Sequence, residues 1–170
     1  MSLELGTLEG NLTEQRVYDG RAFSATYNSG SLASGAYAPV LICLSAGTGV
    51  VVRVTRIKFY IGTSKRVLIV QNPTLSGGSG SPYKSFAYAS ILNRNVGHGQ
   101  SSVSFVKIPS TALTADALTS QVLDDETLAA GQYTYDRSRD PYVITGAALA
   151  LVISGGSGIA ASAVIEWDER

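Results

Sequence analysis

The residues that could carry out catalysis are few in this sequence. His98 is the only histidine, and it lies in a loop-like run, Val96-Gly97-His98-Gly99-Gln100. A serine hydrolase would need it as a general base, but no Gly-x-Ser-x-Gly motif in a strand-turn-helix context accompanies it. We therefore interpret His98 as a surface loop residue, predict no catalytic residue and expect no enzyme. An esterase or glycosidase remains an alternative, because carboxylates distant in sequence can converge in space.

The sequence also predicts no metal site and no cofactor. Acids cluster at Asp124-Asp125-Glu126 and around Asp136 and Asp140, but the calcium-binding EF-hand pattern with its central glycine is absent. One histidine and one cysteine cannot build a common zinc site. The glycine-rich run 76–82 lacks the Lys-Ser/Thr pair of a phosphate-binding loop. Cys43 lies in an apolar run, so we expect it to be a buried residue without a disulfide partner.

The elements that must position any site have a period of two, which is typical of strands. Residues 50–61 alternate apolar and polar side chains, but the phase slips after Thr55. Strict alternation would turn Arg56 inward and expose Phe59, so we predict a β-bulge near Thr55–Arg56 that keeps one face buried. On these alternating faces we predict a core of Val52, Val54, Ile57, Phe59, Ile61, Leu68, Val70, Phe105, Ile153, Ile165 and Trp167.

Further strands are expected at 21–27, 38–45, 66–71, 102–108, 131–136, 142–154 and 159–168, with another within 84–92. Glycine-rich runs at 46–49 and 155–158 resemble hairpin turns. Helical spacing occurs only in 110–129, which predicts one short helix or a loop. The expected fold class is all-β, a two-sheet antiparallel sandwich arranged as a jelly roll. It is expected to form a single domain over residues 20–170.

Residues 1–19 differ from the rest and are predicted to form an extended N-terminal arm outside the sandwich. Leu3, Leu5, Leu8 and Leu12 are spaced among acids without strand alternation, so we expect these four leucines to anchor the protein to a neighbour. Tyr133 and Tyr135 share one face of a short strand, and tyrosine is favoured both in strands and at protein interfaces. We expect these two tyrosines to contribute to a partner interface as well.

Charges are segregated along the chain although the formal net charge is zero. Residues 1–19 carry a net charge of −3, residues 20–115 carry nine bases and no acid, and residues 116–170 carry a net charge of −6. Acidic and basic strands of one subunit can pair across a sheet, or opposite faces can complement each other between subunits. Because no recognised nucleic-acid motif is present, we expect no nucleic-acid partner. The absence of a signal-peptide pattern or a long apolar stretch predicts a protein that is made and used in a cytoplasm, or leaves it by lysis, with no membrane partner.

Two segments resemble a known class of proteins. The strand pair joined by residues 44–57, Leu-Ser-Ala-Gly-Thr-Gly-Val-Val-Val-Arg-Val-Thr-Arg-Ile, resembles the opening strands of small jelly-roll virion proteins of tailed bacteriophages. Residues 160–169, Ala-Ala-Ser-Ala-Val-Ile-Glu-Trp-Asp-Glu, resemble their last strand. That resemblance implies a TNF-like jelly roll, a homotrimer, and a location in the virion with a major capsid or other virion protein as partner. We expect a capsid decoration subunit; the alternative is a receptor- or carbohydrate-binding head domain of a phage fibre or tail.

Overall fold

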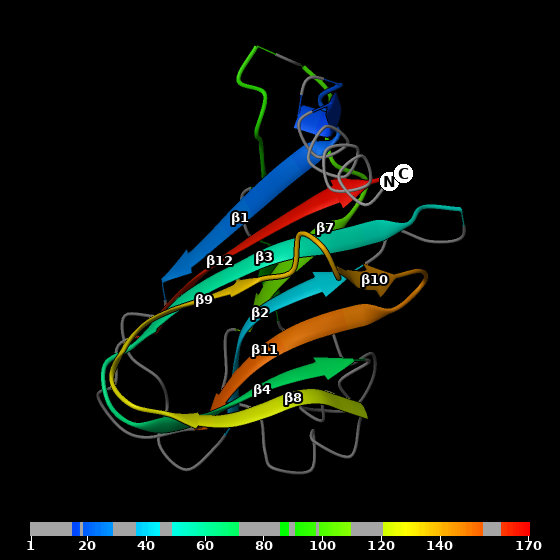
Figure 1. Ribbon diagram of the computed structural model, residues 1–170. Helices are drawn as coiled ribbons and strands as arrows, with labels where there is room; N and C mark the ends of the chain where they lie inside the picture. The colour runs from blue at the N-terminus through cyan, green and yellow to red at the C-terminus, as the bar shows by residue number, and fades with distance from the viewer. Residues whose placement is uncertain are drawn as a thin grey trace, which may run out of the picture.

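The protein folds into two packed layers of antiparallel strands (Figure 1). The computed structural model describes residues 15–17, 19–28, 37–44, 49–71, 86–88, 91–97, 99–109, 121–154 and 161–170. Its strands are β1 (Ala22–Asn28), β2 (Tyr37–Leu44), β3 (Val52–Ile61), β4 (Lys65–Gln71), β5 (Phe86–Tyr88), β6 (Ile91–Asn93), β7 (Phe105–Pro109), β8 (Gln121–Leu128), β9 (Gly131–Asp136), β10 (Tyr142–Ile144), β11 (Ala148–Ser154) and β12 (Ala161–Glu169).

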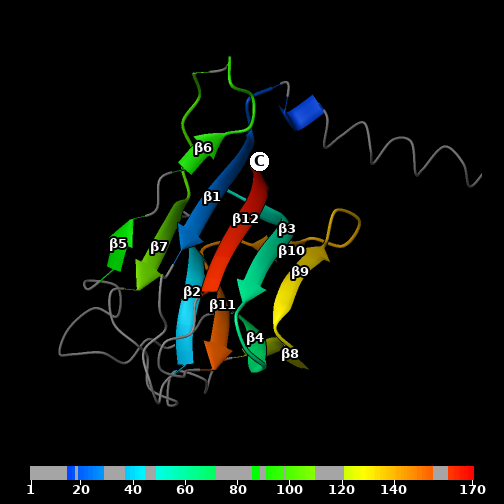
Figure 2. The same cartoon turned by 90° about the vertical axis from the view of Figure 1, so that its left-hand side faces the viewer.

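Each sheet contains six strands. The first, which we call the β1 sheet, has the order β10-β3-β12-β1-β6, with β9 also paired to β3. The second, the β2 sheet, has the order β5-β7-β2-β11-β4-β8. Every strand pair is antiparallel. The expected all-β, two-sheet antiparallel sandwich is therefore confirmed, and β1 and β12 lie side by side in its front layer (Figure 2).

None of the strands described pairs with its neighbour in sequence, which corrects the expected hairpins. The run 46–49 joins β2 to β3, and the run 155–158 lies between β11 and β12. In both cases the flanking strands belong to opposite sheets. Gly49 does adopt a positive φ of 102°, as the glycine-rich run predicted. The glycine signal is thus borne out at Gly49, but β2 and β3 belong to different sheets because each pairs with strands distant in the sequence.

The predicted bulge in β3 is confirmed. Glu166 of β12 pairs with Arg56, and the next residue, Trp167, pairs with Val54, so Thr55 is the extra residue. The Thr55 hydroxyl donates a hydrogen bond to the Glu166 carbonyl oxygen at 3.3 Å. The bulge restores the inward direction of the apolar side chains on both halves of the strand.

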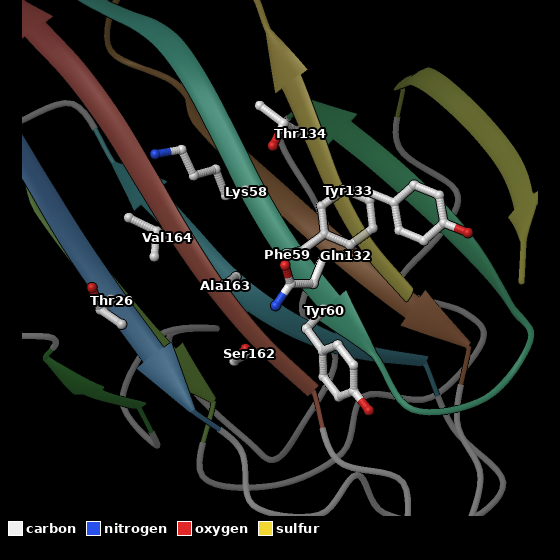
Figure 3. Close-up of a pocket in the computed structure, with 10 residues that line it drawn as sticks. All are labelled: Thr26, Lys58, Phe59, Tyr60, Gln132, Tyr133, Thr134, Ser162, Ala163 and Val164. Carbon is white, nitrogen blue, oxygen red and sulfur yellow. The ribbon is translucent and has the colours of Figure 1, made fainter. Parts of the chain in front are cut away.

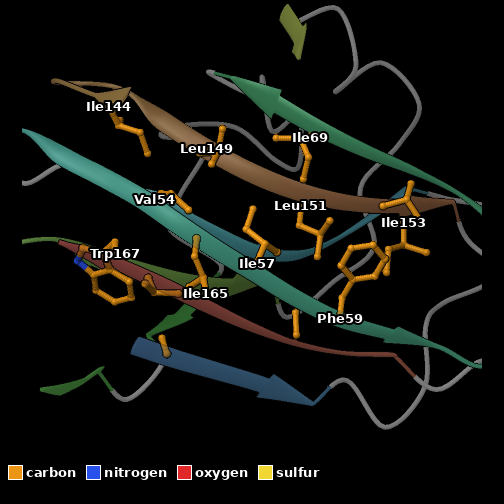
Figure 4. Packing of buried hydrophobic residues seen from close by; sticks show 14 of the residues in the cluster. Val54, Ile57, Phe59, Ile69, Ile144, Leu149, Leu151, Ile153, Ile165 and Trp167 are labelled. Atoms are coloured by element: carbon orange, nitrogen blue, oxygen red, sulfur yellow. The ribbon is translucent and has the colours of Figure 1, made fainter. Parts of the chain in front are cut away.

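The hydrophobic core lies between the two sheets (Figure 4). Ten of the predicted core residues are buried, including Phe59 and Trp167; Phe105 lies in a strand whose side chain at that position is outside the described set. Leu68 and Val70 are buried, but it is Val67 and Ile69 that join the cluster between the sheets. Because side chains alternate along β4, Leu68 and Val70 point to the opposite face of the β2 sheet.

The expectation of one short helix or a loop within 110–129 is wrong for residues 121–128. Residues 121–128 form strand β8, which pairs with β4 along its whole length, while residues 110–120 lie outside the described part of the chain. Pairing with β4 overrides a weak helical pattern, because alternate residues of β8 gain backbone hydrogen bonds to β4 that a short isolated helix would not keep. The described helical residues are 15–17 alone, and no helix among the residues described is long and apolar enough to cross a membrane.

The last residues of the predicted arm are attached to the sandwich. Arg21 donates its backbone N–H to the Arg16 carbonyl at 2.9 Å, and Glu169 donates to the Arg21 carbonyl at 3.0 Å. The Arg16 guanidinium donates to Asp168. Residues 15–17 therefore pack against the end of β12, which the sequence did not predict. The four anchoring leucines, Leu3, Leu5, Leu8 and Leu12, lie outside the described residues.

Candidate functional site: a groove on the outer face of the β1 sheet

A groove with a volume of about 230 Å³ lies on the outer face of the β1 sheet (Figure 3). Strands β1, β12, β3 and β9 cross beneath it. Its lining residues are Thr26, Lys58, Phe59, Tyr60, Gln132, Tyr133, Thr134, Ser162, Ala163 and Val164. The hollow is open to solvent and its size matches a small ring compound rather than a drug-sized ligand.

Cross-strand register arranges the polar residues of the groove in rows. One row runs through Ser162, Tyr60 and Gln132 on β12, β3 and β9, in that order. The next row holds Lys58, with Val164 beside it on β12 and Thr134 beside it on β9. Small side chains on β12, which lies between β3 and β1, lower the floor between the longer side chains of β3 and strand β1. The groove therefore offers hydroxyl, amide and ammonium groups beside a tyrosine ring.

A cluster of charges lies next to the groove, centred on Glu166. Its carboxylate oxygens lie 3.3 Å from Arg56 Nη1, 3.3 Å from Lys58 Nζ and 3.6 Å from Arg94 Nη1. Asp136 adds a second acid, 3.5 Å from Arg56. Three positive charges thus face two negative charges, so the cluster has one positive charge in excess.

A second group of ion pairs lies on the same face of the β1 sheet, near the end of β12. Asp168 is buried and its Oδ1 accepts from Arg16, with Arg53 Nε 4.0 Å away. The Asp168 Oδ2 atom is buried with no hydrogen-bond partner. Burial lowers the pKa of Arg16, while the Asp168 charge opposes that change. Acids of residues 116–170 therefore pair with bases of the earlier segments across one sheet. This agrees with the first interpretation of the segregated charges, in which they pair within one subunit.

Glu169 anchors the connection between β6 and β7. Its carboxylate accepts hydrogen bonds from the backbone N–H groups of Val103 and Ser104, the Ser102 hydroxyl and the Trp167 indole. Burial by itself would raise the pKa of Glu169, but these hydrogen bonds outweigh it and lower the pKa below its usual value. The carboxylate holds this connection at the end of the sandwich where the C-terminus lies (Figure 2).

Tyr133 and Tyr135 do not point outward as free interface anchors. Both are half-buried and pack on Phe59, Tyr133 in a stacked geometry at 5.5 Å and Tyr135 edge-on at 5.2 Å. Their hydroxyls donate to the Ala129 carbonyl and to Glu126, respectively. Burial raises the pKa of Tyr135, and the hydrogen bond to Glu126 raises it further. A role for the two tyrosines in partner binding stays a prediction.

Neither expected acid cluster forms a metal site in the part of the chain that the structure describes. No group of three or more His, Cys, Asp and Glu residues there could hold a metal ion. Asp125 is paired with Arg66 at 2.6 Å, and Asp124 with Arg137 at 3.4 Å. His98 lies outside the described residues, as does the side chain of Cys43.

Sequence reasoning missed the groove, although part of its signal was present. The alternation in 56–61 assigned Lys58 and Tyr60 to the outward face of β3, and this is where they lie. Apart from Phe59, the other lining residues come from β1, β9 and β12, which are brought together with β3 only through long-range pairing.

Comparisons with known proteins give little beyond the architecture. No protein family model matches the sequence, and no curated protein sequence matches it. Among solved structures, the chain is similar to the crystal structure of Yersinia pseudotuberculosis-derived mitogen (YPM). The TM-score is 0.31 and the sequence identity is 11%, over 85% of this chain and 84% of that chain. A likeness at this level carries no argument about function.

Proposed function

We propose that this protein is a non-enzymatic virion structural protein, a capsid decoration subunit that assembles as a homotrimer on a phage head. The proposal combines the resemblance of residues 44–57 and 160–169 with the arrangement of the sandwich. Its partner is a major capsid or other virion protein, with the 1–14 segment and its four leucines as the anchor.

The strand pairing supports the finer proposal of a jelly roll. In a jelly roll, a long antiparallel ribbon of paired strands wraps so that successive pairs fall in alternate sheets. Here β1 pairs with β12, β2 with β11, β3 with β9 and β4 with β8. These four pairs fall alternately in the β1 sheet and the β2 sheet.

The observation that carries the assembly proposal is the edge strand β8. It pairs only with β4 among the strands described, and Val122 and Leu123 on it are 44% and 45% exposed. Leu123 is the extra residue of a register shift, because Val122 pairs with Val70 and Asp124 with Ile69. Adjacent exposed apolar residues on an open edge favour contact with another protein chain.

The acids of β8 are already bonded within the subunit. Asp125 binds Arg66, Asp124 binds Arg137, and Glu126 accepts from Tyr135. A contact along β8 therefore does not need to bury an uncompensated charge, which would be costly. This is the composition expected of a subunit interface, where apolar residues are central and free charges are few.

Ion pairs within the chain argue against a nucleic-acid partner. The bases of residues 20–115 that form ion pairs with acids of the chain include Arg53, Arg56, Lys58, Arg66 and Arg94. A phosphate backbone is bound by bases that have no acids beside them.

The experiment that tests assembly is the molecular mass in solution. Wild-type protein at micromolar concentration is expected to have three times the 17.8 kDa mass of the chain. In the Val122→Asp, Leu123→Asp double variant, the mass is expected to shift toward that of one chain, while the circular dichroism spectrum stays unchanged. Val96→Asp is the matched control, because Val96 is fully exposed on the connection between β6 and β7. A wild-type mass of a single chain would contradict the proposal.

A second candidate function is favoured by the groove on the β1 sheet. Hydroxyl and amide groups beside an exposed tyrosine are the groups that bind carbohydrate, so the groove suits a receptor- or carbohydrate-binding head domain of a fibre or tail. The groove and the β8 edge lie on different parts of the sandwich, so a single subunit can use both.

A further inference from the structure

We infer that the groove on the β1 sheet binds an acidic sugar, a pyranose ring that carries a carboxylate, with Lys58 as the group that recognises the charge. This inference rests on the second candidate function, carbohydrate binding, and adds the ligand class and the residue that selects it. It does not depend on the oligomeric state.

The charge balance beside the groove favours an anion. Glu166 is shared by Arg56, Lys58 and Arg94, and Asp136 by Arg56, so one positive charge is not compensated. The Lys58 side chain is 46% exposed, more than the other two cations of this cluster. A ligand carboxylate beside Lys58 neutralises the excess positive charge, whereas a neutral ligand leaves that charge in place.

The geometry of the groove suits one sugar ring. Lys58 and Tyr60 project from the same face of β3 and lie two residues apart, which is about 7 Å along a strand. Tyr60 is 39% exposed, so its ring can cover the apolar face of a sugar while its hydroxyl stays in water. Figure 3 shows Lys58 and Tyr60 toward opposite ends of the groove, with Gln132 between them.

The floor and the far wall provide hydrogen bonds to sugar hydroxyls. Ser162 on β12 and Gln132 on β9 flank Tyr60 in register, and Thr134 flanks Lys58. Val164 lies beside Lys58 on β12 and forms an apolar part of the groove lining. A carboxylate at the Lys58 end and ring carbons over Tyr60 then place the remaining hydroxyls against Ser162 and Gln132.

The test is a titration of isotope-labelled protein with two matched trisaccharides, galacturonic acid and galactose, followed by backbone amide NMR shifts. We expect shifts that cluster on β3, β9 and β12, and an affinity for the acidic sugar that is about five- to tenfold higher. Added salt is expected to reduce that preference. Equal affinity for the two sugars overturns the acidic class but keeps carbohydrate binding, and no shift with either sugar overturns both.

Variants separate the role of Lys58 from the folding of the sheet. Lys58→Gln is expected to abolish the preference for the acidic sugar, while Lys65→Gln, at the start of β4 in the other sheet, keeps it. Thr26→Trp fills the groove from β1 without removing a charge, and is expected to abolish binding of both sugars. If Lys58→Gln binds the acidic sugar as tightly as wild type, or if Thr26→Trp still binds, the inference is wrong.

Discussion

The Trp167 indole donates a hydrogen bond to a Glu169 carboxylate oxygen at 3.2 Å. The two residues lie two positions apart on β12, so both point to the same face of the β1 sheet. A carboxylate is thereby buried at the end of the hydrophobic core. The free-energy cost of removing its charge from water is offset by hydrogen bonds from residues 102–104. The core and the β6–β7 connection are joined through this one group.

Replacing Glu169 is expected to loosen the connection and destabilise the fold. In Glu169→Gln, an amide NH₂ group replaces one carboxylate oxygen; at the Oε2 position it faces the Val103 N–H, which then has no acceptor there. We expect a loss of about 2 kcal/mol in the free energy of unfolding, measured by urea denaturation. Asp140→Asn serves as the control, because the Asp140 side chain is 93% exposed, and it is expected to change stability by less than about 0.5 kcal/mol. Equal effects of the two variants would contradict the anchoring role.

The pH dependence of stability follows from the same site. The pKa of Glu169 is lower in the folded protein than in the unfolded chain, so the folded state favours the ionised form. Its contribution is therefore complete at neutral pH and is lost as the pH falls below about 4.3, the ordinary glutamate pKa, through the folded value. We expect the free energy of unfolding of wild type to fall more steeply with acidification than that of Glu169→Gln. Parallel curves would show that another group dominates.

Arg16 is expected to contribute more to the stability of the fold than the residues before it. Deleting residues 1–15 removes the leucines but keeps the Arg16–Asp168 pair, so thermal unfolding of the isolated domain is expected to change little. Arg16→Ala leaves the buried Asp168 with only Arg53, at 4.0 Å. We expect that variant to lose about 1–3 kcal/mol. A full-length Arg16→Ala variant as stable as wild type would show that the pair contributes nothing.

Thr55 provides a test of the bulge. Thr55→Ala removes a hydroxyl that bonds the Glu166 carbonyl and is expected to cost about 1 kcal/mol. Deleting Thr55 removes the extra residue, after which strict alternation by itself keeps Val54, Ile57 and Phe59 on the inward face. That deletion is expected to keep cooperative unfolding, as measured by circular dichroism. A deletion variant that no longer unfolds cooperatively would contradict the assignment of Thr55 as the extra residue.

The sequence by itself determined the features that depend on neighbouring residues. Alternation along 50–61 predicted the inward residues Ile57 and Phe59, and the phase slip located the bulge at Thr55, because side chains of a strand alternate with a fixed period. The positive φ of Gly49 followed from its glycine-rich run. Local patterns also gave the class of fold, since most of the strands were marked by composition and spacing.

The tertiary structure alone decided which strands meet, and with them the candidate site. Tyr60, Gln132 and Ser162 are up to 102 positions apart in the sequence and become neighbours only through the pairing of β3 with β9 and β12. The pairing of β12 with β3 also brought Glu166 to Arg56 and Lys58. Pairing with β4 made residues 121–128, which lie within the segment expected to be a short helix or a loop, into an edge strand. Such contacts are set by the burial of complementary faces across the whole chain, which no local pattern records.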